Sequence, residues 1–155
     1  MRIHILAIGN KMPAWVEHGF REYSKRFPPS CTLALTEVPA EKRAKLYNAP
    51  QLMKRESDKL LTYSKPGNRI IALDRQGKYW STTQLSAQLA EWQQDGRPID
   101  FLIGGPDGLT DDCLQKTEFT WSLSPLTLPH PLVRIILAEQ LYRALSILQN
   151  HPYHR

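Results

Sequence analysis

Three short stretches of the chain could bind a ligand, because each follows a run that is typical of a buried strand. They are Leu73-Asp74, the turn "GGPDG" that begins at Gly104-Gly105, and the segment "SLSPLTLPHPLVR" from Ser122 to Arg134. Ligands of open parallel sheets bind at the carboxyl ends of strands, so we expect these stretches to form one site. Taken alone, the glycine-rich turn favours the plainer interpretation of a tight turn that needs a positive φ.

The third stretch contains three prolines in thirteen residues, and Leu123, Leu126 and Leu128 make it apolar. Prolines fix its path, and the leucines could wall an aromatic ring. Main-chain groups that have no helix or ladder partner could then bond to that ring. The alternative is a buried loop that only packs against its surroundings.

The chain lacks both the G-x-G-x-x-G fingerprint and the P-loop pattern. Nucleotide cofactors with two or three phosphates need such backbone cradles. S-adenosylmethionine carries an adenine ring, a ribose, a sulfonium and an amino-acid tail but no phosphate. Apolar walls with a few well-placed main-chain groups hold adenine well, which makes this cofactor compatible with the proline-rich stretch.

The elements that would position these stretches alternate between strand and helix. Strands are predicted at 2–9, 31–38, 69–74, 99–105 and 117–124, and helices begin near Pro13, Pro50, Ser81, Thr110 and Pro131. Ser81 and Gln84 match a capping box, which strengthens the third helix. This alternation predicts an α/β fold around a mostly parallel sheet, in one domain over residues 1–155.

Composition is typical of a globular protein in a reducing, cytoplasmic environment. The chain has 155 residues, of which 41% are hydrophobic and 23% charged, and no apolar run long enough for a bilayer span. Cys31 and Cys113 are far apart, and neither they nor the five histidines have metal-ligand spacing. We therefore expect no metal site and no membrane segment.

Charge is unevenly distributed along the chain, whose formal net charge is +5. Residues 1–78 hold 15 Lys and Arg against 7 Asp and Glu, whereas the second half is slightly acidic. A basic half suggests a polyanionic partner, although a solvated lysine surface explains it equally well.

Four segments resemble the RlmH-type family of ribosomal RNA large-subunit methyltransferases, which belong to the SPOUT class. They are "GNKMPAWVEHGFREYSKRFP" from Gly9, "LIGGPDGL" from Leu102, the proline-rich stretch, and the ending "NHPYHR". The resemblance covers the whole chain. It implies an α/β knot with a C-terminal trefoil, a homodimer, and S-adenosylmethionine-dependent methylation of N3 of a pseudouridine in helix 69 of 23S rRNA on the ribosome.

The resemblance also implies which residues bind the cofactor. By motif position these are Leu73, Gly104, Leu123, Ser124, Pro125, Leu126, Thr127 and Leu128. Pro125 departs from the small residue that is more common in the family. Because proline has no N–H, it cannot donate a bond to the cofactor there.

Methylation at N3 of a uracil-like ring requires loss of the N3 proton, and the chain's ending offers groups for this step. We expect His154 to accept the proton, Tyr153 to stack on or bond to the base, and Arg143 to steady negative charge. A frayed terminus is the alternative for the first two. For Arg143 the alternative is an i,i+4 pair with Glu139.

Two further expectations concern residues outside this set. His130 begins the last helix, and we favour a capping or packing role for it. Lys42, Arg43 and Lys45 form a basic cluster in a loop, and the hypothesis is that they contact RNA phosphates.

Two rival functions stay compatible with the sequence. One is a non-catalytic RNA- or ribosome-binding α/β module. The other is a metabolic α/β enzyme that acts on a different adenine-containing ligand, with the basic charge incidental.

Overall fold

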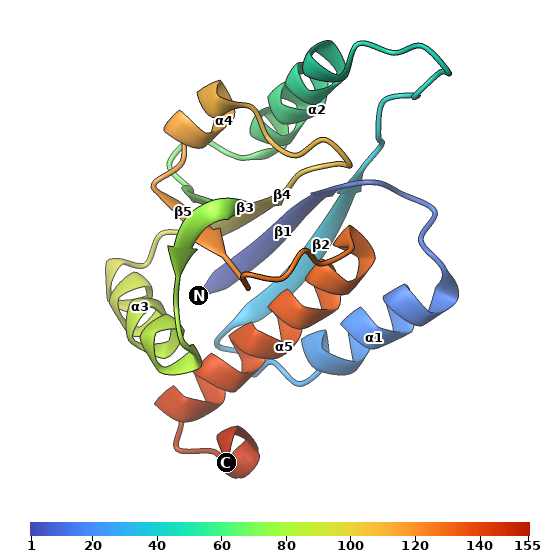
Figure 1. The fold of residues 1–155 in the computed structure, drawn as a ribbon. Helices are drawn as coiled ribbons and strands as arrows, with labels where there is room; N and C mark the ends of the chain where they lie inside the picture. The colour runs from blue at the N-terminus through green and yellow to red at the C-terminus, as the bar shows by residue number, and fades with distance from the viewer.

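The computed structural model describes all 155 residues as five strands, five α-helices and a terminal 3-10 helix (Figure 1). In chain order the elements are β1 Arg2–Ile8, α1 Ala14–Ser24, β2 Thr32–Val38, α2 Ala49–Tyr63, β3 Arg69–Tyr79, α3 Thr82–Asp95, β4 Ile99–Ile103, α4 Asp111–Gln115, β5 Phe119–Ser122, α5 His130–Leu148 and η1 Pro152–His154. Each of the five predicted helices is present. The predicted capping box is also confirmed, with Ser81 and Gln84 exchanging both bonds at the start of α3.

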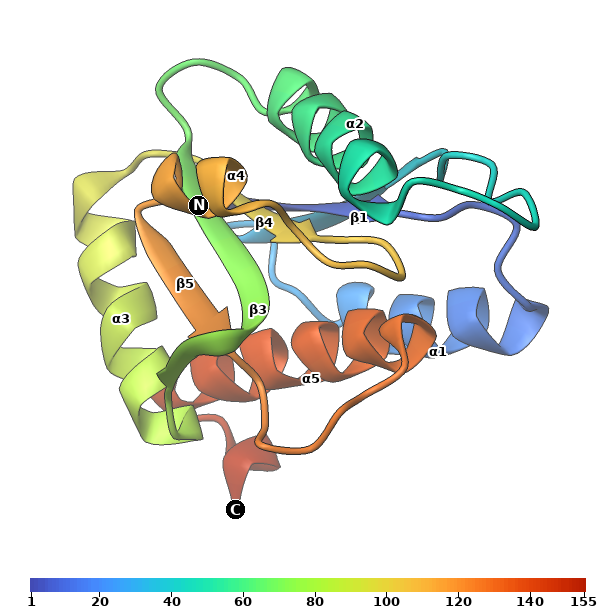
Figure 2. The ribbon, with the colours of Figure 1, turned by 45° about the horizontal axis from the view of Figure 1, so that its top comes forward.

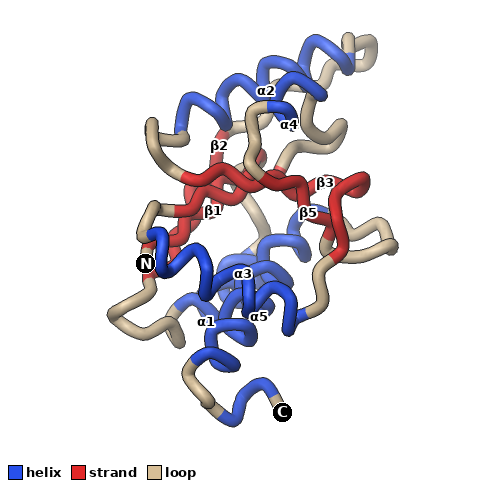
Figure 3. Tube along the Cα trace, turned by 90° about the vertical axis from the view of Figure 1, so that its left-hand side faces the viewer, coloured by secondary structure: helices blue, strands red, loops and turns tan.

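The strands form one sheet in the order β2-β1-β4-β3-β5, and every neighbouring pair is parallel. Helices α1, α3 and α5 cover one face, while α2 and α4 cover the other (Figure 3). The α/β prediction with a parallel sheet is therefore confirmed. The trefoil knot that the resemblance implies stays a prediction.

Side chains that alternate along the strands fill a separate core on each face of the sheet. On β1, Ile3, Ile5 and Ala7 enter the larger core under α3 and α5, while Leu6 and Ile8 enter the smaller core under α2 and α4. Strands that are buried on both faces give the continuous apolar runs seen in the sequence. No helix is both long and apolar enough to cross a membrane.

The strand that was expected to end at Asp74 continues to Tyr79, which corrects the sequence prediction. Leu73 and Lys78 both pair with Trp121, so the intervening residues bulge out of the ladder. Gly77 makes the return possible, because a Cβ there would lie 2.6 Å from the Trp121 carbonyl carbon. Asp74 is therefore the first residue of the bulge, and it has no pairing partner on β5.

A buried carboxylate links several segments near the amino ends of the strands. Asp100 on β4 is almost fully buried, and its Oδ2 accepts bonds from Ser64 Oγ at 2.6 Å and Asn68 Nδ2 at 2.9 Å. Ser64 ends α2 and Asn68 precedes β3. One side chain thus joins three segments that are distant in sequence.

Replacing Asp100 by alanine should lower the free energy of unfolding by about 1–3 kcal/mol, because two polar groups lose their buried acceptor. Urea denaturation measures this loss. The exposed Gln94→Ala variant is the control and should change the free energy by less than about 0.5 kcal/mol. Equal stabilities of the two variants would show that the Asp100 network contributes nothing.

Candidate functional site

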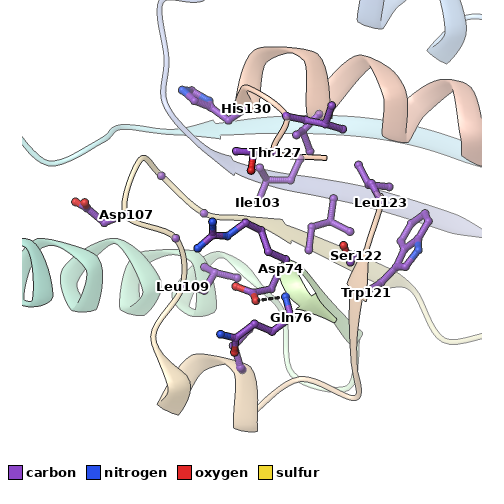
Figure 4. Close-up of a pocket in the computed structure, with 18 of the residues that line it drawn as sticks. Asp74, Gln76, Ile103, Asp107, Leu109, Trp121, Ser122, Leu123, Thr127 and His130 are labelled. Carbon is purple, nitrogen blue, oxygen red and sulfur yellow. Dashed lines mark hydrogen bonds between the residues drawn. The ribbon is translucent and has the colours of Figure 1, made fainter. Parts of the chain in front are cut away.

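The three predicted strand ends line one cleft, which has a volume of about 540 Å³ (Figure 4). Its walls include the bulge within β3, the turn after β4 and the segment between β5 and α5. Of the residues predicted to hold a cofactor, the cleft is lined by Leu73, Gly104, Leu123, Ser124, Leu126, Thr127 and Leu128. Pro125 belongs to the same segment but does not line the cleft.

Residues 123–129, which we call the proline bend, connect β5 to α5 without regular structure (Figure 2). The Leu126 amide donates to Ser124 Oγ at 3.0 Å, and Ser122 Oγ donates to the Ser124 carbonyl at 3.1 Å. No other amide between Leu123 and Leu128 donates to a group of the chain. Leu126 is 71% exposed. The proline bend therefore offers apolar side chains and uncommitted main-chain groups together.

The glycine-rich turn after β4 is tight, as one of its two interpretations required. Gly108 has a φ of 83°, and its amide donates to the Gly105 carbonyl at 3.0 Å. A Cβ on Gly104 would lie 2.9 Å from the Gly108 carbonyl carbon. A Cβ on Gly105 would lie 2.7 Å from Glu56 Oε1. Close packing thus requires these glycines, and the turn they form is also a wall of the cleft.

Arg43 links this turn to α2 through ion pairs, which contradicts its predicted role as an RNA contact. Its guanidinium donates to both oxygens of Glu56 at 2.7 and 3.0 Å, and to Asp107 Oδ2 at 3.0 and 3.2 Å. The Glu56 carboxylate, which is fully buried, raises the pKa of Arg43 above its usual value. Its donors are therefore committed inside the protein, whereas Lys42 and Lys45 are exposed.

A buried arginine that the sequence did not reveal, Arg134, anchors the start of α5. Arg134 pairs with Glu37 at 2.7 Å and donates to the carbonyls of Ile8 and Gly9 at 3.1 and 2.7 Å. It thereby joins α5 to the carboxyl ends of β1 and β2. The signal was a charged residue inside the broad apolar stripe of the last helix.

His130 lines the cleft at the first residue of α5. It makes no capping bond. Its ring packs close to the backbone of Gly9, because a Cβ added to Gly9 would lie 3.3 Å from His130 Cε1. Burial lowers the pKa of His130, and the charge of Arg134 lowers it further, which favours the neutral imidazole. Its Nδ1 is buried without a partner.

The predicted catalytic residues gather at the other end of α5, outside the cleft of their own chain (Figure 1). Tyr153 Oη donates to Glu139 Oε1 at 3.2 Å, and its ring lies 4.7 Å from that of Tyr142. Arg143 pairs with Glu139 at 2.6 Å, as the alternative interpretation predicted, and its Cζ lies 4.9 Å from the Tyr153 ring.

The docked tail rules out a frayed terminus for Tyr153, since several contacts hold its ring. Burial raises the pKa of Tyr153, and the Glu139 carboxylate raises the pKa of Arg143. His154 is half-buried, with its Nδ1 unpartnered. No cluster of three or more His, Cys, Asp or Glu side chains is placed to hold a metal ion.

A family model described as "Predicted SPOUT methyltransferase" matches residues 1–154. Among solved structures, a methylase family protein from Haemophilus influenzae Rd KW20 superposes with a TM-score of 0.60 at 11% identity, over 99% of this chain and 70% of that one. A protein from Bacillus anthracis described as an RNA methyltransferase gives 0.51 at 13% identity, over 97% and 96%.

A protein from Legionella pneumophila described as a methyltransferase, solved in complex with the cofactor SAM, gives a TM-score of 0.50 at 13% identity. The superposition covers 93% of this chain and 66% of that one. At these identities the three likenesses support a shared fold.

Replacing Arg43 by alanine should destabilise the protein by about 3–5 kcal/mol, because Glu56 would stay buried without its cation. Lys42→Ala, which removes a neighbouring exposed cation, should change the free energy of unfolding by less than about 0.5 kcal/mol. Urea denaturation of both variants measures the difference. If Arg43→Ala is as stable as Lys42→Ala, the buried network does not support the turn.

Proposed function

The chain belongs to the SPOUT methyltransferase family, and from this premise we propose that it methylates N3 of a pseudouridine in helix 69 of 23S rRNA. We further propose that the methyl donor is S-adenosylmethionine. The observation that carries the proposal is the cleft at the strand ends, with the proline bend as one wall. The family match supports methyl transfer, while the resemblance in sequence supports the ribosomal substrate. The Bacillus anthracis structure, described as an RNA methyltransferase, agrees with an RNA substrate.

The chemistry of the cleft fits the proposed donor. Its volume of about 540 Å³ lies within the range of about 300–1,000 Å³ that is usual for small-molecule sites. Leu123, Leu126 and Leu128 would wall the adenine, and the uncommitted amides of the proline bend would bond to its ring nitrogens. Leu73 and Gly104 would close the opposite side. The Legionella pneumophila structure, which contains SAM, supports this assignment.

We propose that Pro125 acts through its rigidity and not through a cofactor bond. Proline lacks an N–H, and Pro125 does not line the cleft. It would fix its own φ and restrict Ser124, the residue before it, to an extended conformation, which keeps this part of the bend from forming a helix.

A homodimer would bring the proposed catalytic residues to a cleft. Tyr153, His154 and Arg143 do not line the cleft of their own chain. Trp15 on α1 and Leu132 on α5 are large apolar side chains that are 52% and 38% exposed on neighbouring helices. We propose that this face meets a second copy, so that the tail of one chain reaches the cleft of the other.

In the proposed reaction the bound cofactor would supply an electrophilic methyl group, whose bond to the sulfonium sulfur breaks so that S-adenosylhomocysteine leaves. The chain's residues position the base and move one proton. His154 would accept the N3 proton as the nitrogen lone pair attacks the methyl carbon. Tyr153 would stack on the ring, and Arg143 would steady the negative charge that develops on the base. Positioning can contribute about 7–11 kcal/mol. That exceeds the roughly 3–5 kcal/mol expected from a positioned base.

Replacing His154 by alanine should lower methyl transfer by about 10²–10⁴-fold, because the proton acceptor is lost. Affinity for S-adenosylhomocysteine should stay within about twofold, since His154 lies outside the proposed cofactor site. Transfer of labelled methyl to ribosomes that lack the modification measures the first quantity, and calorimetry measures the second. Tyr153→Ala should behave in the same way, and Tyr153→Phe should retain more activity because it keeps the ring.

The exposed Gln94→Ala variant, on α3 and outside both the tail and the proposed dimer face, is the control and should methylate normally. Normal transfer by both His154→Ala and Tyr153→Ala would refute the catalytic assignment while leaving the enzyme class intact. A wild-type protein that binds ribosomes but neither S-adenosylhomocysteine nor the methyl donor would instead be a non-catalytic binding module.

With Arg43 committed internally, we propose that only Lys42 and Lys45 of the basic cluster contact RNA phosphates. The double variant Lys42→Ala/Lys45→Ala should flatten the slope of log affinity against log salt by about 1.4, from about 0.7 per phosphate contact. A salt titration of RNA binding measures the slope. The double variant Lys54→Ala/Arg55→Ala, on the exposed side of α2, is the control. An unchanged slope in Lys42→Ala/Lys45→Ala would discard the phosphate contacts.

A further inference from the structure

Three carboxylates line the cleft of a protein that is otherwise basic: Asp74, Asp107 and Asp111. They are not equivalent. Asp107 accepts two bonds from Arg43, so its charge is compensated within the chain. Asp111 is exposed in the first turn of α4, where an acidic residue suits the helix dipole. Asp74 is the one of the three that has neither an ion pair nor a helix terminus to stabilise its charge.

The bulge in β3 gives one oxygen of the Asp74 carboxylate a main-chain partner. Its Oδ1 accepts a hydrogen bond from the main-chain N–H of Gln76 at 2.9 Å, and its Oδ2 has no partner in the chain. Gly77 returns the strand to β5 directly afterwards. Figure 4 shows Asp74 among the side chains that line the cleft, with the dashed bond to Gln76 and with Ile103 and Thr127 beyond it.

The next residue, Arg75, brings the opposite charge to the same bulge. Arg75 is exposed, lines the cleft and makes no ion pair or hydrogen bond within the chain. A carboxylate and a guanidinium therefore stand at consecutive positions, both without a charged partner. Two unpaired opposite charges in one cleft suit a zwitterionic group.

We propose that Asp74 and Arg75 form the subsite for the amino-acid tail of the cofactor. Asp74 Oδ2 accepts a bond from the α-ammonium, and the Arg75 guanidinium donates to the α-carboxylate. This inference rests on the proposed function, because it assumes that an adenosyl amino acid occupies the cleft. The proline bend takes the adenine, so the tail extends across the cleft to the bulge. Charge-assisted hydrogen bonds of this kind are about twice as strong as neutral ones.

The competing explanation is that Asp74 only closes the bulge through its bond to Gln76. Asp74→Asn separates the two explanations, because an asparagine Oδ1 still accepts the Gln76 amide but carries no charge. Arg75→Gln likewise keeps a polar side chain while removing the cation. Two variants of exposed residues outside the cleft, Asp112→Asn and Arg55→Gln, are matched controls for the change in charge.

The experiment is calorimetry with three probes that differ only in the tail. S-adenosylhomocysteine carries ammonium and carboxylate, its decarboxylated form carries ammonium alone, and 5′-methylthioadenosine carries neither. Asp74→Asn should bind the first two probes about tenfold more weakly than the wild type and bind the third equally well. Arg75→Gln should lose about tenfold for S-adenosylhomocysteine alone. The control variants should match the wild type for all three probes.

Two results would overturn the inference while the proposed function stands. One is an Asp74→Asn variant that weakens 5′-methylthioadenosine as much as S-adenosylhomocysteine, because the effect would then arise from the shape of the bulge. The other is unchanged affinity of both variants for every probe that the wild type binds. A wild-type protein that binds none of the three probes would overturn the proposed function and, with it, this inference.

Discussion

Uncommitted main-chain amides in the proline bend are the feature on which the site depends. Buried backbone N–H groups almost always find partners, and a helix or a strand ladder would have supplied them within the chain. Pro125 and Pro129 keep residues 123–129 out of both, so the amides stay available beside exposed Leu126. An adenine ring offers acceptors at its edge and apolar faces, and it therefore complements both properties of the bend.

Two internally paired arginines, Arg43 and Arg134, hold the walls around the proline bend in place. Arg134 fixes the first turns of α5 to the carboxyl ends of β1 and β2, which sets where the bend must end. Arg43 joins α2 to the turn after β4 through Glu56 and Asp107. Each guanidinium binds groups from two other elements in a fixed planar geometry, which a lysine could not reproduce. Arg43 and Arg134 thus serve the internal architecture, whereas Lys42 and Lys45, beside Arg43 in the chain, are exposed and contribute to the basic surface.

Features that depend on local sequence pattern, such as strands, helices and caps, could be predicted. Features that depend on contacts between distant residues, such as buried ion pairs, could not. Apolar runs and the capping box at Ser81 predicted the parallel α/β fold, and sheet topology correctly brought Leu73, Gly104 and the proline bend together. The extension of β3 beyond Asp74 was missed, because a polar bulge hides the ladder that resumes at Lys78. Arg43 resembled a surface cation until folding brought Glu56 and Asp107 against it. Spacing alone likewise could not tell that the tail docks on α5, remote from the cleft of its own chain.

The decisive experiment is a crystal structure with S-adenosylhomocysteine. We expect a purine between Leu123 and Leu128, bonded to amides of the proline bend, with a second copy's tail over the cleft. A bend that is filled by its own leucines, with the ligand bound elsewhere or absent at saturating concentration, would contradict it.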